Sequence, residues 1–113
     1  DGGVNLYPMR EIREKGHSAV LRRLLERVST PYCHVSWDVD SLDAAYIPAT
    51  GLPIPDGPTP RQVTEVLTAL AATGKAVALD CVEYNPARDP DGSCCRTVLD
   101  ILKPVLLALA AAQ

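Results

Sequence analysis

Two strand-like segments, each lying between helical segments, most narrowly limit what this chain can fold into. In Tyr32–Asp40 apolar residues alternate with polar ones, which is typical of a strand with one apolar face. Ala76–Tyr84 is nearly continuous in apolar residues, as expected of a parallel strand that is covered on both faces. Between them, Thr59 and Pro60 predict a helix start, and apolar residues then recur at helical spacing up to Gly74. This order predicts an α/β fold with a parallel sheet and right-handed crossovers.

Helical periodicity also flanks the two strands. Residues 9–29 contain two helical pieces that are divided at Gly16 and closed by Pro31. The final helix contains the longest apolar run, Pro104–Ala112, which is shorter than the roughly 20 residues that a membrane-spanning helix needs. Because two parallel strands leave unpaired edges, we expect further strands from an upstream segment or from another chain.

Composition excludes several classes of partner. The chain has 113 residues, of which 47% are hydrophobic and 22% charged, as in an ordinary globular domain. A net charge of −3 and an aromatic content of 4% provide neither the basic surface nor the stacking side chains that nucleic acid needs. We therefore expect neither nucleic acid nor a membrane as a partner.

The four cysteines indicate a reducing environment. They show no CxxC spacing, and no signal-like segment opens the sequence, so we expect a cytoplasmic location. Cys33 and Cys81 fall within the apolar strand patterns and are predicted to be buried thiols.

Acidic residues follow both strands at their carboxyl ends. Asp38 and Asp40 close the first strand and Glu83 closes the second, so the three are expected to lie near one another at the edge where such sheets bind ligands. Since residues two apart on a strand point the same way, Asp38 and Asp40 are predicted to share a site, and a hard divalent cation would relieve their repulsion. Aspartates also cap turns at strand ends, and this spacing occurs by chance, so a structural role stays open and no reaction is specified.

A longer pattern within Ser36–Gly57 is more specific. Its positions are Ser36, Trp37, Asp38, Val39, Asp40, Ala44, Pro48, Ala49 and Gly57. This pattern resembles the signature of the ureohydrolase family, the binuclear manganese enzymes that include arginase, agmatinase and formimidoylglutamase. Trp37 and Ala44 are mild departures from it. The segments Leu6–Gly16 and Ala78–Pro86 are similar to those that flank the signature in this family.

The resemblance implies a three-layer, arginase-like α/β fold with a parallel sheet, in which residues 1–113 are the C-terminal part of a single domain. It implies that Asp38 bridges two Mn²⁺ ions, that Asp40 binds one of them, and that Glu83 pairs with the guanidinium of the substrate. The residue types suit these roles, because carboxylate oxygens bind Mn²⁺ and match the donors of a guanidinium.

Three more residues are candidates for supporting the metal ligands. His34 and Ser36 share the strand face of the two aspartates, and Asp80 lies on the second strand. His34 is expected to pack beside the ligands rather than to bind metal, since the resemblance places the histidine ligands in upstream motifs. Asp80 is predicted to be buried, either beside the site or as a purely structural partner.

The implied function is manganese-dependent hydrolysis of a guanidino compound by a metal-bridging hydroxide, in the complete protein. The family's GGDHS-type and DAHxD-type motifs do not occur in these 113 residues, nor does its general-acid histidine, so the isolated chain is expected to be inactive and to contain no confident catalytic residue. The segment VEYNP resembles the arginase form of this strand more than the agmatinase form, which favours arginase, the enzyme that releases ornithine and urea. Leu52 replaces a threonine common in arginases, and agmatinase or formimidoylglutamase stays the alternative within the family. The resemblance also suggests a homo-oligomer, a trimer or a hexamer. The alternative is a non-catalytic fragment or paralogue that keeps the fold and the oligomer surfaces.

Overall fold

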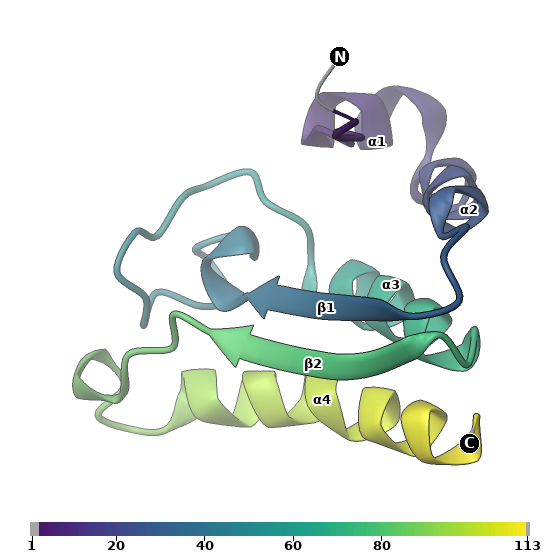
Figure 1. Cartoon of the computed structure of the whole chain (residues 1–113). Helices are drawn as coiled ribbons and strands as arrows, with labels where there is room; N and C mark the ends of the chain where they lie inside the picture. The colour runs from purple at the N-terminus through teal and green to yellow at the C-terminus, as the bar shows by residue number, and fades with distance from the viewer. Residues whose placement is uncertain (1–2, 113) are drawn as a thin grey trace.

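The computed structural model describes residues 3–112 and confirms the predicted alternation of helices and strands (Figure 1). The elements are α1 (Met9–Lys15), α2 (His17–Arg27), β1 (Cys33–Asp38), η1 (Val39–Ser41), α3 (Pro60–Ala72), β2 (Ala76–Val82), η2 (Pro86–Arg88) and α4 (Ser93–Ala111), where η denotes a 3₁₀ turn. Helix α3 begins where the sequence predicts, because the Thr59 hydroxyl accepts the Gln62 amide while the Gln62 side chain accepts the Thr59 amide.

The two strands pair in parallel, as predicted, and both end earlier than their apolar patterns suggest. Val35 is opposite Leu79, and Asp38 is opposite Val82. After Asp38 the chain turns into η1, so the predicted strand Tyr32–Asp40 is too long at its carboxyl end. After β2, Glu83 has a φ of 68°, which breaks the extended backbone. Both strands therefore stop at the acidic residues that were expected to lie on them.

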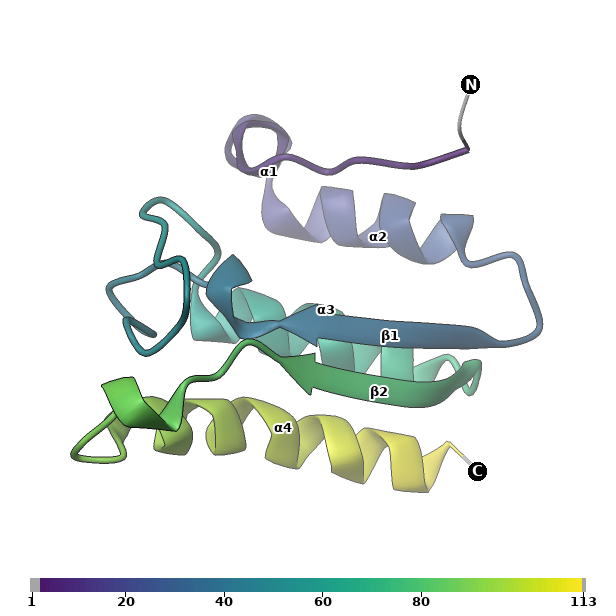
Figure 2. The ribbon, with the colours of Figure 1, turned by 60° about the vertical axis from the view of Figure 1, so that its left-hand side comes forward.

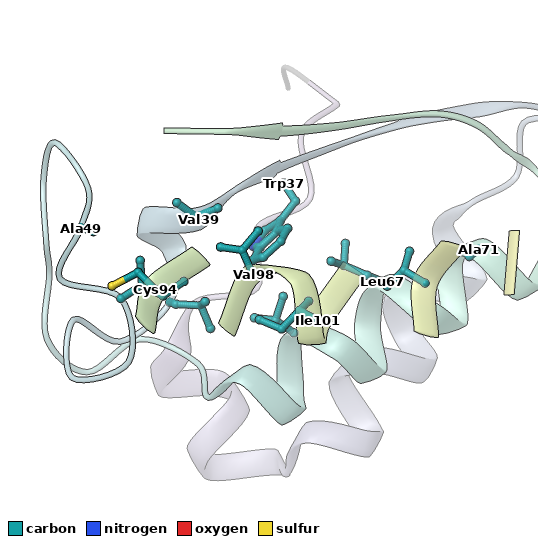
Figure 3. Packing of buried hydrophobic residues seen from close by; sticks show 12 residues of the cluster. Trp37, Val39, Ala49, Leu67, Ala71, Cys94, Val98 and Ile101 are labelled. Atoms are coloured by element: carbon teal, nitrogen blue, oxygen red, sulfur yellow. The ribbon is translucent and has the colours of Figure 1, made fainter. Parts of the chain in front are cut away.

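The hydrophobic core lies between the sheet and helices α3 and α4. Trp37 points from β1 toward these helices, where it joins Leu67 of α3 and Val98 and Ile101 of α4 (Figure 3). Trp37 is only 4% exposed, which confirms that its face of the strand is the buried one. The core continues beyond the strand, since Val39 in η1 is fully buried. Helix α2 lies beside α3 (Figure 2).

Strand β2 is much less buried than its composition predicts. Val77 is 65% exposed, and Cys81 is exposed as well, so the expectation of a strand covered on both faces is not met within the described chain. The prediction of buried thiols is also wrong for Cys81 and only partly right for Cys33, which is half-buried. Both differences have the same cause. An apolar pattern shows that a residue is suited to burial, but a residue is buried only where another layer of the protein covers it.

Within residues 3–112, none of the helices combines the length and the apolarity that crossing a membrane would require.

Candidate metal and substrate site

The candidate site lies at the carboxyl ends of the two parallel strands. Both strands point toward the same end of the molecule, where η1, the loop that follows it, and η2 are gathered (Figure 2). Asp38 is the last residue of β1, and Glu83 immediately follows β2. Parallel pairing thus brings together acidic residues that are far apart in the sequence.

A tight turn joins Asp38 to Asp40. Asp38 is the N-cap of η1, and its Oδ1 accepts a hydrogen bond from the Asp40 amide at 3.1 Å. Asp40 therefore lies in the 3₁₀ turn rather than on the strand, and the expectation that the two residues share one strand face is wrong. The turn nevertheless leaves the two carboxyl groups close enough for Asp38 to raise the pKa of Asp40.

The electrostatics of Asp40 reflect this crowding. Burial raises the pKa of the Asp40 carboxyl, and the adjacent Asp38 carboxyl and the charge of Glu83 raise this pKa further. Glu83 thus acts electrostatically on Asp40 from the other strand. The end of the sheet is therefore negatively charged, which favours a cation there.

These donors fit part of a manganese site. Carboxylate oxygens are ligands that Mn²⁺ accepts, and a cation would offset the repulsion that raises the pKa of Asp40. In residues 3–112, however, no three His, Cys, Asp or Glu side chains lie close enough together to hold an ion by themselves. Asp38 and Asp40 can therefore supply part of a coordination shell, and the roles assigned to them remain predictions.

Glu83 combines an exposed side chain with a constrained backbone. A positive φ is uncommon for a residue other than glycine, and Glu83 is one of two such residues in the described chain, the other being Asp56. Its carboxylate lies over Gly51, since a Cβ added to that glycine would be 3.7 Å from Glu83 Oε2. This carboxylate is accessible to a positively charged ligand.

The three proposed supporting residues lie farther back along the strands. His34 Nε2 is 2.9 Å from Asp80 Oδ2, and Ser36 is opposite Asp80 in the parallel register. The prediction that Asp80 is buried is wrong, because 54% of its side chain is exposed. All three side chains project from the face of the sheet opposite Trp37, which the described residues leave uncovered.

Asp43 and Gly57, which received no individual role from the sequence, shape the loop beside the site. Asp43 Oδ1 accepts the Ala45 amide and Oδ2 accepts the Asp56 amide, both at 2.8 Å. A Cβ at Gly57 would come within 2.6 Å of the Asp43 nitrogen and 2.7 Å of the Ser41 oxygen, so only glycine fits. The close approach at Gly57 gives a physical reason for the glycine at the end of the pattern.

Another residue missed by the sequence reasoning is Asp89, which anchors the start of α4. Its carboxylate accepts hydrogen bonds from the Cys94 amide at 3.1 Å, the Cys95 amide at 2.8 Å and the Tyr84 hydroxyl at 2.8 Å. Burial raises the pKa of Asp89, but the hydrogen bonds from Cys95, Tyr84 and Cys94 outweigh burial and lower the pKa to about 2. The sequence signal was an aspartate shortly before a predicted helix.

Comparisons with known proteins agree on one family. The model of the family described as "Arginase family" matches residues 1–108. The chain is 40% identical over 105 residues to the arginase of Brucella melitensis, and the match covers 91% of this chain and 34% of that protein.

Solved structures show the same likeness. Proclavaminate amidino hydrolase from Streptomyces clavuligerus superposes with a TM-score of 0.88 at 30% identity, covering 98% of this chain and 37% of that one. Formimidoylglutamase from Bacillus subtilis superposes with a TM-score of 0.86 at 26% identity, covering 94% and 34%. The predicted arginase-like fold is therefore confirmed, and the chain spans about a third of the length of these relatives.

Proposed function

Because the chain belongs to the arginase family, we propose that the complete protein of which it forms part hydrolyses a guanidino compound. The observation that carries this proposal is that Asp38 and Asp40 of the signature pattern and Glu83 after β2 lie at the carboxyl ends of two paired parallel strands, where the charge of Glu83 acts on Asp40. Arginine is the proposed substrate, with ornithine and urea as products, and a cytoplasmic homo-oligomer is the proposed form. The choice of arginine as substrate is supported by the segment VEYNP and by the identity to the Brucella arginase.

Asp38 and Asp40 would hold manganese. Both residues would bind the ions through carboxylate oxygens, and bound manganese would supply a water of lowered pKa. The turn η1 contributes by fixing the spacing of the two carboxyl groups, because the Asp40 amide donates to Asp38 Oδ1. The loop held by Asp43 and Gly57 supports this turn from the side.

Glu83 would recognise the guanidinium. Its carboxylate is exposed and offers two oxygens to the fork of N–H donors that a guanidinium presents. Because Glu83 comes from the second strand, it approaches the site independently of the metal ligands. Metal binding and substrate binding are therefore expected to respond to different substitutions.

The test uses the complete protein, loaded with manganese and assayed for urea release from arginine and agmatine and for formamide release from N-formimidoylglutamate. Turnover of arginine above the other two would support the proposal. Faster turnover of one of the other two compounds would identify that compound as the substrate in place of arginine. If a manganese-loaded protein turned over none of them, the non-catalytic alternative would be favoured.

A further inference from the structure

The backbone at Glu83 needs external support. A left-handed φ of 68° is unfavourable for a glutamate, since its Cβ approaches the neighbouring carbonyl oxygen, and such conformations persist only where the surroundings impose them. The residues that impose this one are therefore as important to the direction of the carboxylate as Glu83 itself.

Support comes from the loop that follows η1. The Asn85 amide donates to the Ala49 carbonyl at 2.9 Å, and Thr50 and Tyr84 form an antiparallel bridge. Arg88 adds a contact that depends on its side chain, because Nη1 donates to the Thr50 carbonyl at 2.8 Å. The first two contacts join backbone atoms and so depend little on residue type. The Arg88 contact requires a long side chain with a donor group at this position.

The Arg88 contact is held firmly at both ends. Arg88 ends η2, where its amide donates to the Asn85 carbonyl at 3.0 Å and the Asn85 side chain accepts the Ala87 amide at 3.1 Å. At the other end, Thr50 is fully buried. If the Thr50 carbonyl lost its hydrogen bond from Arg88, water could not easily replace that donor because the residue is buried. We therefore expect the loop around Thr50 to move.

A movement of this loop would displace Gly51, which lies beside the Glu83 carboxylate. Gly51 follows Thr50 directly, and a Cβ at Gly51 would be 3.7 Å from Glu83 Oε2. A shift of the Thr50 backbone is thus transmitted to the Glu83 carboxylate through a single residue.

We infer that Arg88 is a positioning residue, which orients Glu83 for the substrate by holding the Thr50 carbonyl. The inference rests on the proposed function, in which Glu83 binds the guanidinium. It assigns Arg88 no contact with metal or substrate.

The experiment compares four forms of the complete, manganese-loaded protein: wild type, Arg88→Met, Arg88→Lys and Arg96→Met. Arg96 is a matched control, because its Nη1 also donates to a backbone carbonyl, that of Asp91 at 3.0 Å, but at the exposed start of α4. We would measure kcat and KM, manganese content, and hydrogen exchange of the Asn85 amide.

Arg88→Met should raise KM about fivefold or more with kcat within about twofold, because substrate binding is weakened while the metal stays in place. Its manganese content should be unchanged, and its Asn85 amide should exchange faster. Arg88→Lys keeps a donor that reaches the carbonyl and should recover most of the loss, and Arg96→Met should match wild type.

Loss of manganese in Arg88→Met, a change confined to kcat, or kinetics and exchange equal to those of Arg96→Met would overturn the inference. If wild type hydrolyses no guanidino substrate, the proposed function fails separately. The Asn85 exchange rate then decides whether Arg88 holds this loop, since unchanged exchange would remove the inference by itself.

Discussion

Three aspartates that lie close together in the sequence have different surroundings in the structure. Asp38 accepts the amide of Asp40 at the start of the turn η1, and the Asp38 carboxyl raises the pKa of Asp40 in addition to the larger effect of burial. Asp43 instead accepts two backbone amides with its two oxygens and thereby organises the following loop. One acidic stretch thus contains both a candidate ligand pair and a structural residue.

Replacing Asp38 with alanine in the complete protein should remove manganese and activity together, because Asp38 is the proposed ligand and also caps the turn that places Asp40. Elemental analysis and the urea assay measure the two effects. Asp100→Ala, on the exposed surface of α4, is the control and should change neither. Full manganese content in the Asp38 variant would refute its assignment as a ligand.

Glu83→Gln should keep the metal and lose binding of the substrate, because it preserves the shape of the side chain and removes only the charge. We expect kcat/KM to fall at least about tenfold, which corresponds to about 1.4 kcal/mol of transition-state stabilisation. Glu14→Gln, on the exposed side of α1, serves as the control. Unchanged kinetics on both arginine and agmatine would exclude the role proposed for Glu83.

Gly57→Ala should destabilise the complete protein by about 1–3 kcal/mol, because the new methyl group would meet rigid backbone atoms of Ser41, Leu42 and Asp43. Gly51→Ala is the matched control, since its methyl group would meet Glu83 at an ordinary contact distance. Denaturant unfolding compares the two. Equal stability of both variants would show that the loop relaxes around the extra atom.

At the scale of elements, the end of one element determines the beginning of the next. Helix α4 has Gly92 as its N-cap, which offers no side chain. The Ser93 amide donates to Asp91 instead, and the amides of Cys94 and Cys95 donate to Asp89 in the preceding loop. The same carboxylate accepts the Tyr84 hydroxyl, so Asp89 connects the exit of β2 to the start of α4. This connection lies just behind Glu83 in the chain.

Asp89→Asn should lower the melting temperature by several degrees near neutral pH and reduce the acid sensitivity of stability. The pKa of Asp89 is about 2 in the folded protein, below the ordinary value of about 3.9. Its contribution to stability is therefore present above about pH 4 and is lost as the pH falls toward 2. Thermal unfolding between pH 2 and 6 should show a weaker pH dependence in this variant than in Asp100→Asn, which replaces an exposed carboxyl group of α4. Identical pH profiles would contradict the assignment.

At the scale of the whole molecule, the described chain leaves large apolar surfaces without cover. Val77 and Val82 of β2 are 65% and 40% exposed, and Leu99, Leu106 and Leu107 form an exposed row on α4. Relatives of about three times this length share the fold. In the complete protein we expect additional segments to cover the strand edges, since open apolar edges promote association.

The 113-residue chain on its own should release no urea and bind Mn²⁺ weakly, because two carboxylates leave each ion short of ligands. It should also self-associate through β2. Calorimetric titration with Mn²⁺, urea assays and sedimentation measure these properties, with the complete protein as the reference. Micromolar binding of two ions with measurable urea release would show that the missing motifs are dispensable or that association rebuilds the site.

The sequence alone determined the α/β class, the start of α3, the core position of Trp37 and the meeting of the two acidic strand ends. These features depend on local periodicity, on capping residues next to each other in the chain, and on the rule that parallel strands present their carboxyl ends at one edge. The resemblance of Ser36–Gly57 to the ureohydrolase signature predicted the family, and the match to the arginase family model confirmed that prediction.

Only the tertiary structure decided how the strands end, which residues are covered and what holds Glu83. Alternation continues through Asp40 in the sequence, but the Asp38 cap turns the chain into η1 first. Asp80 is suited to burial by its neighbours, yet no layer covers it within the described residues. The bond from Arg88 to Thr50 joins positions 38 residues apart, and periodicity carries no information about a contact made across that distance between a side chain and a backbone carbonyl.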